Sequence, residues 1–273
     1  MLKVFFGHHK CASQWIALVI ERVCNEMALK SFCAYQDEIN KYGSLQSLID
    51  KEKPDFLIIP ESNKDRIKEI KMDFLGFHTV RDPRDIIVSC YFSHKKSHKI
   101  SNYIPTIEHR NKLQQLPKKE GIDYEITISK VFIENLYNWE YNNPNILETK
   151  FEKITSSPQE EFEKIFNFLG FFEIKETILL SLICYYNRML RKLKINKWTI
   201  RLTNYSKSQL QKTLKDLSFQ SLKKGKFIGL GNTSNHYRKG VSGDWKNHLT
   251  PEQEQTILAF FPEILQKLNY TDE

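Results

Sequence analysis

The sequence predicts an α/β protein, in which helices flank a central parallel sheet. Three short apolar runs, at 2–6, 56–59 and 74–80, have the length and composition of buried strands. Helical patterns separate these runs, and strands that alternate with helices pair in parallel. The chain has 273 residues, of which 40% are hydrophobic, so it is long enough to bury one large core. We therefore expect a single domain over 1–273.

The other elements continue this alternation. Behind the first run, apolar residues recur at the i, i+3, i+4 spacing of a helix with one buried face. Another helix begins within Asp85–Tyr91, and the stretch 142–154 returns to a strand. The stretch 158–170 is a helix that ends at Gly170.

The loops that follow the three apolar runs are expected to meet. In open α/β sheets, ligands bind in the crevice outside the carboxyl ends of the strands. The expected site therefore combines Gly7–Ser13, Pro60–Asn63 and Arg81–Asp85 on one edge of the sheet.

Residues 95–125 interrupt the pattern, because they are polar and basic and contain few apolar positions. Long segments without secondary structure in compact domains are usually functional or disordered. We interpret this stretch as a mobile insertion that forms a lid or part of an acceptor site.

The charge balance favours anionic partners. The chain carries 41 Lys and Arg against 33 Asp and Glu, a net charge of +8. Its five cysteines have neither metal-type spacing nor the even number of a disulfide set, which is typical of reduced cytosolic proteins. We find no signal-peptide pattern and no apolar run of the roughly 20 residues that a bilayer requires. We expect a cytoplasmic protein.

The stretch 188–215 is strongly basic. No acidic residue occurs between Thr177 and Lys215, whereas Lys and Arg are frequent and tyrosines and Trp198 lie among them. Such a surface can contact an acidic acceptor, membrane headgroups or nucleic acid, and it can equally be a solvated helix face. The sequence leaves both interpretations open.

The loop after the first run, GHHKCASQW, has the features of an anion site. The N–H groups at the start of a helix carry partial positive charge, and Lys10 adds a full charge. Ser13 and Gln14 can donate side-chain hydrogen bonds to the same group. The usual triphosphate loop has a second glycine followed by adjacent Lys and Ser or Thr, and this loop has neither. An ordinary helix with Ser13 as its N-cap is the alternative.

A second stretch, RDPRDIIVSCYF, places a cation at the end of the third run. Arg81 offers a forked donor pair that suits a monophosphate, and Ser89 lies two helical turns later. Arg84 and Asp85 are expected to form ion pairs with charged neighbours in the same stretch.

The third stretch lies near the C-terminus. Arg238 and Lys239 directly precede Gly240, where the backbone can approach an anion without a Cβ in the way. A basic pair beside a glycine has the outline of a phosphate clamp.

Together, the three stretches resemble the motifs of the cytosolic-type sulfotransferases, which use 3′-phosphoadenosine 5′-phosphosulfate (PAPS). HHKCASQW is similar to that family's phosphosulfate loop, PKSGTTW, and RDPRDIIVSCYF to its 3′-phosphate motif, RNPRDxxVSYY. RKGVSGDWKNHLT is similar to the family's block RKGxxGDWKNxFT. The resemblance implies a P-loop NTPase-like α/β fold. It also implies PAPS as the co-substrate and in-line transfer of a sulfuryl group to an acceptor hydroxyl, less often an amine.

The resemblance also implies roles for individual residues. Lys10, Ser13 and Gln14 would bind the 5′-phosphosulfate, and Lys10 would stabilise the bridging oxygen as the S–O bond breaks. Trp15 and Phe219 would sandwich the adenine. The 3′-phosphate would be held by Arg81, Ser89, Arg238, Lys239 and Gly240.

The general base is less obvious, because the family's catalytic histidine is absent from the matching stretch, LIIPESNK. Glu61 is the leading candidate, since some sulfotransferase subfamilies use a glutamate in this role; a surface carboxylate at a helix start is the alternative. His9, or His8 beside it, is the second candidate. His94 and His98 share one helix face, but no third ligand has recognisable spacing, so no metal is expected.

Other functions remain open. A protein of the same fold that binds the donor nucleotide without catalysis is compatible with the missing histidine. A P-loop kinase has a similar fold, and a nucleic-acid-binding protein would use the basic stretch, although no nucleic-acid partner is expected. The expected acceptor is a small molecule, a glycan or a lipid, and 188–215 is a candidate for peripheral contact with acidic surfaces.

Overall fold

The computed structural model describes residues 1–100, 103–172, 178–218, 221 and 242–270. Some of the residues with predicted donor-binding roles lie outside the described residues, namely Phe219, Arg238, Lys239 and Gly240. None of the helices within the described ranges is long and apolar enough to cross a membrane.

A five-stranded parallel sheet forms the centre of the protein, with the strand order β2-β3-β1-β4-β5. The predicted fold class and the strands predicted from apolar runs are confirmed. The short strand β2 was not predicted, because three residues are too few to show a pattern. The strands are β1 (Leu2–Phe6), β2 (Ser31–Cys33), β3 (Phe56–Ile59), β4 (Phe74–Val80) and β5 (Ile146–Lys150).

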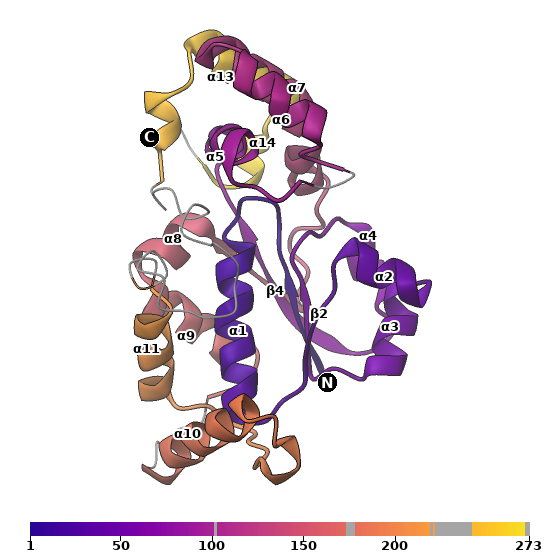
Figure 1. The fold of residues 1–273 in the computed structure, drawn as a ribbon, viewed down its shortest axis with the longest axis vertical. Coiled ribbons are helices and arrows are strands. Elements are labelled where there is room, and N and C mark those ends of the chain that lie inside the picture. The colour runs from indigo at the N-terminus through magenta and orange to yellow at the C-terminus, as the bar shows by residue number, and fades with distance from the viewer. Residues whose placement is uncertain (101–102, 173–177, 219–220, 222–241, 271–273) are drawn as a thin grey trace.

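Helices cover both faces of the sheet (Figure 1). On one face, Phe5 and Phe77 pack against α1, α9, α10 and α11. On the other face, Val4 and Phe6 pack against α2, α3 and α4. Because both faces are covered, consecutive residues of β1 are fully buried, as is usual in parallel sheets. These helices are α1 (Ser13–Met27), α2 (Gln36–Tyr42), α3 (Leu45–Glu52), α4 (Asp65–Glu69), α9 (Pro158–Phe168), α10 (Ile178–Lys192) and α11 (Lys207–Asp216).

A third group of helices gathers beyond the carboxyl ends of the strands, at the top of Figure 1. It has its own apolar core, which includes Val80 at the end of β4. The expected site therefore lies between the sheet and this group. The group consists of α5 (Pro83–Lys96), α6 (Ile107–Gln115), α7 (Lys118–Tyr137), α13 (Pro251–Phe260) and α14 (Ile264–Lys267). Three shorter helices complete the described chain: α8 (Phe151–Ser156), η1 (Asn196–Trp198) and η3 (Asp244–Asn247).

The expectation that 95–125 lacks secondary structure was wrong. The stretch contains α6 and the first turns of α7, which pack against α5. Thr106 caps α6 by accepting a hydrogen bond from the backbone N–H of His109, at 3.1 Å. Leu113 and Ile122 are fully buried, and these few apolar positions are enough to anchor helices that are otherwise polar. A role for the stretch at an acceptor site stays a prediction.

We predict that Gly7→Ala is more destabilising than Gly43→Ala. A Cβ on Gly7 would lie 2.6 Å from the Pro60 carbonyl oxygen and 2.6 Å from Ser13 Oγ, so the backbone must move. Gly43 has open space around it and only a left-handed backbone, with φ of +80°. We expect a loss of about 3 kcal/mol for Gly7→Ala, against about 1 kcal/mol for Gly43→Ala. Urea denaturation of both variants measures the difference, and equal losses would contradict the steric argument.

Candidate active site

Three loops meet at the carboxyl ends of the adjacent strands β3, β1 and β4, as the sequence predicts. The Gly7 N–H donates to the Ile59 carbonyl, at 2.7 Å, and the Ser62 N–H donates to the Gly7 carbonyl, at 2.7 Å. Arg81, after β4, donates from Nη1 to the Lys10 carbonyl, at 3.0 Å. The loop after β1 is therefore held from both sides by the loops of its neighbours.

The loop after β1 turns sharply into α1. Lys10 and Ala12 both adopt left-handed backbone conformations, with φ of 62° and 64°. Ser13 is not the N-cap, because its hydroxyl donates back to the His8 carbonyl, at 2.8 Å, and Ala12 occupies the cap position. No side chain caps α1 and no acidic residue lies in its first turn. Among the described residues, no carboxylate caps this helix start, so its N–H groups can bind an anion.

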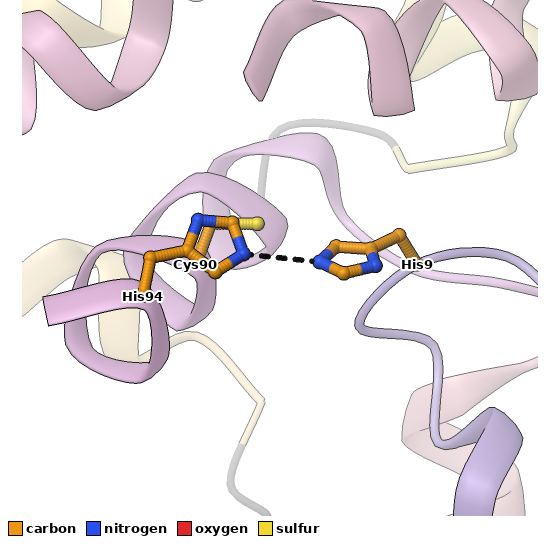
Figure 2. Close-up of side chains that lie close together, drawn as sticks. All are labelled: His9, Cys90 and His94. Atoms are coloured by element: carbon orange, nitrogen blue, oxygen red, sulfur yellow. Dashed lines mark hydrogen bonds between the residues drawn. The ribbon is translucent and has the colours of Figure 1, made fainter. Parts of the chain in front are cut away.

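His9 lies in a buried chain of hydrogen bonds that links the loop to α5 and α7. Its Nδ1 lies 3.2 Å from Glu61 Oε1, and its Nε2 lies 3.2 Å from His94 Nε2. Figure 2 shows His9 facing His94 and Cys90 of α5. His94 Nδ1 in turn lies 2.8 Å from Glu125 Oε1. The two carboxylates are thus joined through two imidazoles.

Burial shifts the pKa values of the groups along this chain of hydrogen bonds. Burial, reinforced by Lys10 and His94, lowers the pKa of His9 well below its ordinary value. Burial also raises the pKa of Glu61, against the opposing effect of the Lys10 charge. The Glu61 side chain is nevertheless 53% exposed, so solvent can reach it. The side chain of His9, in contrast, is buried. Glu61 is therefore the accessible end of the chain.

Glu125 is the other, fully buried end. Its carboxylate accepts hydrogen bonds from His94 Nδ1, from His109 Nε2 at 3.1 Å, and from the Ser129 hydroxyl. Burial disfavours its charge, but these donors outweigh burial and bring the pKa of Glu125 to about 2. Sequence reasoning missed Glu125 and His109, because they lie in the stretch interpreted as a lid.

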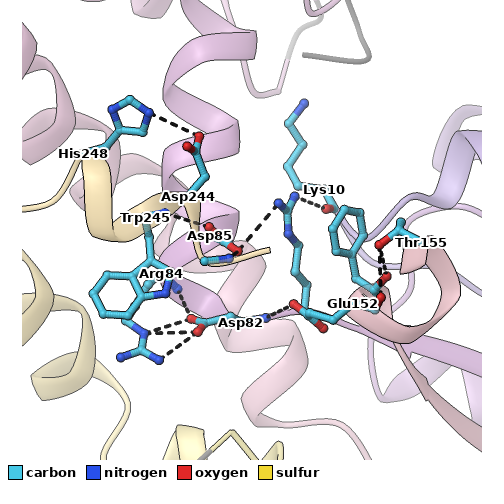
Figure 3. Close-up of polar contacts among 12 residues, drawn as sticks. Lys10, Asp82, Arg84, Asp85, Glu152, Thr155, Asp244, Trp245 and His248 are labelled. Atoms are coloured by element: carbon cyan, nitrogen blue, oxygen red, sulfur yellow. Dashed lines mark hydrogen bonds and ion pairs between the residues drawn. The ribbon is translucent and has the colours of Figure 1, made fainter. Parts of the chain in front are cut away.

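Arg81 is the centre of a second polar network, and Figure 3 labels its partners Lys10 and Asp85. Its Nη2 lies 3.9 Å from Asp85 Oδ2, and its guanidinium stacks 3.9 Å above the ring of Phe151. Asp85 also accepts hydrogen bonds from the N–H groups of Gly243, at 2.8 Å, and Trp245, at 2.9 Å. It thereby ties the segment after 238–240 to α5.

Arg84 pairs with Asp82, at 2.8 Å, and with Glu254 of α13, at 2.6 Å. Its guanidinium also stacks 3.9 Å above the ring of Trp245. The predicted ion pairing within the RDPRD stretch is therefore confirmed, through Arg84–Asp82 and Arg81–Asp85.

Lys10 is the cation that remains available at the loop. It forms no ion pair with any residue in the described part of the chain, and Figure 3 shows its side chain extending away from Asp82 and Asp85. Partial burial lowers the pKa of its ammonium group. Ser89 lies on α5, half-buried, in the helix that Arg81 precedes.

Trp15 and Gln14 are placed differently from each other at the start of α1. Trp15 is buried, donates from Nε1 to the Leu217 carbonyl at 2.8 Å, and contacts the edge of Phe162. Gln14 is exposed and donates to the Tyr35 hydroxyl, at 2.5 Å. Trp15 thus joins α1 to the segment that leads towards Phe219, which lies outside the described residues.

Comparisons with known proteins identify the family to which this chain belongs. Residues 77–269 match the family model of the sulfotransferase domain. Cytosolic sulfotransferase 3 of Arabidopsis thaliana is 32% identical over 122 residues, which are 44% of this chain and 32% of that protein. Human sulfotransferase 2A1 is 26% identical over 206 residues, which are 70% of this chain and 56% of that protein. The matches thus span about a third to just over half of these relatives.

A solved sulfotransferase structure has a similar fold. Mouse sulfotransferase SULT7A1, complexed with PAP, has a TM-score of 0.56 at 19% identity, and the match covers 97% of this chain and 85% of that one. This likeness concerns the fold alone. Because the family model matches more than half of the chain, the protein belongs to the sulfotransferase domain family.

Proposed function

We propose that the protein transfers a sulfuryl group from PAPS to an acceptor hydroxyl. The observation that carries the proposal is the meeting of Lys10, Glu61 and Arg81 at the ends of three adjacent strands. An in-line transfer needs a held donor, positive charge at the leaving oxygen and a base at the acceptor. The three residues can supply these three requirements.

In the proposed reaction, the acceptor oxygen attacks the sulfur while the bond between sulfur and the bridging oxygen breaks. The products are the sulfated acceptor and adenosine 3′,5′-bisphosphate (PAP). Lys10 stabilises the negative charge that develops on the leaving phosphate, together with the uncapped N–H groups of α1. Ser13 and Gln14 begin that helix and complete the phosphosulfate site.

Arg81 and Ser89 are proposed to hold the 3′-phosphate, with Arg238, Lys239 and Gly240. Arg81 already fixes the Lys10 carbonyl, so the two ends of the donor are held by one connected unit. Asp85 supports the same site, because it holds the backbone of Gly243, three residues after Gly240. Trp15, with Phe219, is proposed to contact the adenine.

Glu61 is the better placed of the two candidate bases. Its carboxylate is half-exposed at the strand edge and can receive the acceptor's proton. His9 is buried, and both of its ring nitrogens already have partners. We therefore assign the base to Glu61 and a positioning role to His9.

The basic stretch 188–215 and the part of α10 that precedes it carry exposed apolar residues that favour contact with an anionic lipid surface. Ile178 and Leu182 on α10 are 84% and 60% exposed, and Leu193 and Trp198 are also exposed. Arg188, Arg201 and Lys207 pair with acidic residues elsewhere in the described chain, at distances of 3.6, 2.5 and 2.9 Å. Apolar residues flanked by cations are typical of helices that lie on membrane surfaces. We propose that this surface brings the enzyme to lipid or glycan acceptors.

We predict that PAP binds the wild-type protein and that ATP does not. Arg81→Ala should weaken PAP binding by about 10- to 100-fold, since it removes hydrogen bonds to a charged group. Arg201→Ala is the control, because this exposed arginine pairs with Asp55 and lies outside the three loops. Calorimetric titration measures the binding of PAP to the wild type, Arg81→Ala and Arg201→Ala, and the binding of ATP to the wild type. Failure of PAP to bind the folded wild-type protein would overturn the proposed function, and tight ATP binding would favour a kinase.

We predict that Glu61→Gln lowers kcat by about 100- to 10,000-fold, because the variant cannot accept a proton. PAP binding should be nearly unchanged, since Glu61 is not assigned to the donor site. Glu160→Gln, an exposed carboxylate on α9, is the matched control. The assay is sulfate transfer from PAPS to a panel of hydroxyl acceptors. Full activity in Glu61→Gln would remove it as the base, and PAP binding without transfer to any acceptor would favour the non-catalytic alternative.

We predict that the protein sediments with anionic vesicles and not with zwitterionic ones. Lys192, Lys194 and Lys197 are exposed, and changing all three to Gln should weaken vesicle binding by about 100-fold, at ~1 kcal/mol per charge. The same change at Lys64, Lys68 and Lys71, which are exposed around α4, is the matched control. Equal losses in both variants would show a general charge effect and contradict a specific surface.

A further inference from the structure

We propose that His9, Cys90 and His94 form a binding site for a zinc-type divalent cation. The site joins the loop after β1 to α5, directly beside Lys10. It goes beyond the proposed sulfuryl transfer and does not depend on it.

The three ligand atoms are gathered in the buried interior. Their two imidazole nitrogens and the Cys90 sulfur all lie within 4.8 Å of one another. Cys90 and His94 are fully buried, one turn apart on α5, and His9 reaches them from the loop (Figure 2). Neutral imidazole and thiolate are the ligands that zinc prefers, and cysteine and histidine one helical turn apart share a face.

Each imidazole is oriented by a carboxylate behind it. Glu61 lies 3.2 Å from His9 Nδ1, and Glu125 lies 2.8 Å from His94 Nδ1. Metal-binding histidines almost always donate their second N–H to a carboxylate, a carbonyl or water, which fixes the tautomer. With both Nδ1 atoms protonated in this way, both Nε2 lone pairs are directed into the space between the rings.

The hydrogen bonds along this chain require one more positive charge than two neutral imidazoles supply, and the missing charge belongs between the two Nε2 atoms. Three contacts join Glu61, His9, His94 and Glu125, and each needs one proton. Two neutral imidazoles carry only two protons, and the carboxylates hold both of them on the Nδ1 atoms. The two Nε2 atoms lie 3.2 Å apart, and in this arrangement neither of them carries a proton. A third proton or a cation must occupy the gap.

The distance between the two nitrogens fits a cation as well as a shared proton. Two nitrogen ligands of tetrahedral zinc lie about 3.3 Å apart, given the usual zinc–nitrogen distance. The observed separation of 3.2 Å agrees with this value. A shared proton uses the two nitrogens alone, whereas a cation also uses the Cys90 sulfur, which otherwise has a hydrogen bond with Ser129. Burial raises the pKa of the Cys90 thiol, and a bound divalent cation overcomes this by displacing the thiol proton.

A neighbouring group of possible ligands is explained without a metal. His94, His109 and Glu125 also lie close together. The Glu125 carboxylate, however, already accepts hydrogen bonds from both histidines and from Ser129. Glu125 therefore orients His94 and is a positioning residue for the cation site.

The test is titration of the untagged protein with Co²⁺, followed by absorption. A Cys33→Ser background removes the one cysteine of the five that is partly exposed. We expect one equivalent of Co²⁺ to bind, with the intense visible bands of a tetrahedral site and a thiolate-to-cobalt charge-transfer band. Zn²⁺ should displace the Co²⁺ and remove both. The absence of saturable binding of one equivalent would overturn the proposal and leave a shared proton in the gap.

Variants separate this site from adventitious binding. Cys90→Ser should lose the charge-transfer band, whereas Cys24→Ser, a buried thiol in another core, should keep it. Glu125→Gln should weaken Co²⁺ affinity by about 10- to 100-fold, as is usual for the residue behind a ligand. His94→Gln should weaken it at least as much. Cys90→Ser changes little in size, so its result stands even where His94→Gln fails to fold. A charge-transfer band that persists in Cys90→Ser would contradict the assignment.

Discussion

The close approach of the Gly7 backbone to the turn after β3 is the constraint on which the site depends. Gly7 donates to Ile59 and accepts from Ser62, so the chain leaves β1 in contact with the segment that carries Glu61. No side chain fits there, because Ser13 Oγ and the Pro60 carbonyl already occupy the space. The loop must then turn back towards α1, and it does so through the left-handed conformations of Lys10 and Ala12. The position of Lys10, the lysine proposed to act at the leaving oxygen, is thus a consequence of strand pairing.

The helices beyond the strand ends also hold the loop after β1 in place. Their apolar core holds α5 and α7 side by side, which brings His94 and Glu125 into contact. A buried carboxylate is costly unless donors surround it, and Glu125 has three. His94 then contacts His9, so the loop is fixed from above by α5 as well as from the side by β3 and β4. The polar residues of α6 and α7 therefore hold the loop in place.

Sequence reasoning could predict the sheet and the edge of the site, because both depend on local patterns. Apolar runs of four to seven residues identified β1, β3 and β4, and the polar residues that follow each run identified the loops. The chain of histidines and carboxylates has no such pattern. Glu125 lies 31 residues from His94, and His94 lies 85 residues from His9, so only the packing of α5 against α7 and the loop reveals them. The helices of 95–125 escaped prediction because one buried face needs few apolar residues.

The contacts of His9 bear on which group accepts the proton in the proposed reaction. With a cation on His9 Nε2, the Nδ1 proton stays directed at Glu61 and the imidazole has no free lone pair. With a proton shared between His9 and His94, both nitrogens are again occupied by hydrogen bonds. In either state, His9 can accept a proton only by breaking a buried contact, which is unfavourable without a replacement partner. Glu61 keeps an accessible carboxylate oxygen in both states, because its side chain is half-exposed. These contacts thus disfavour His9 as the base and hold the Glu61 carboxylate in position for its proposed role.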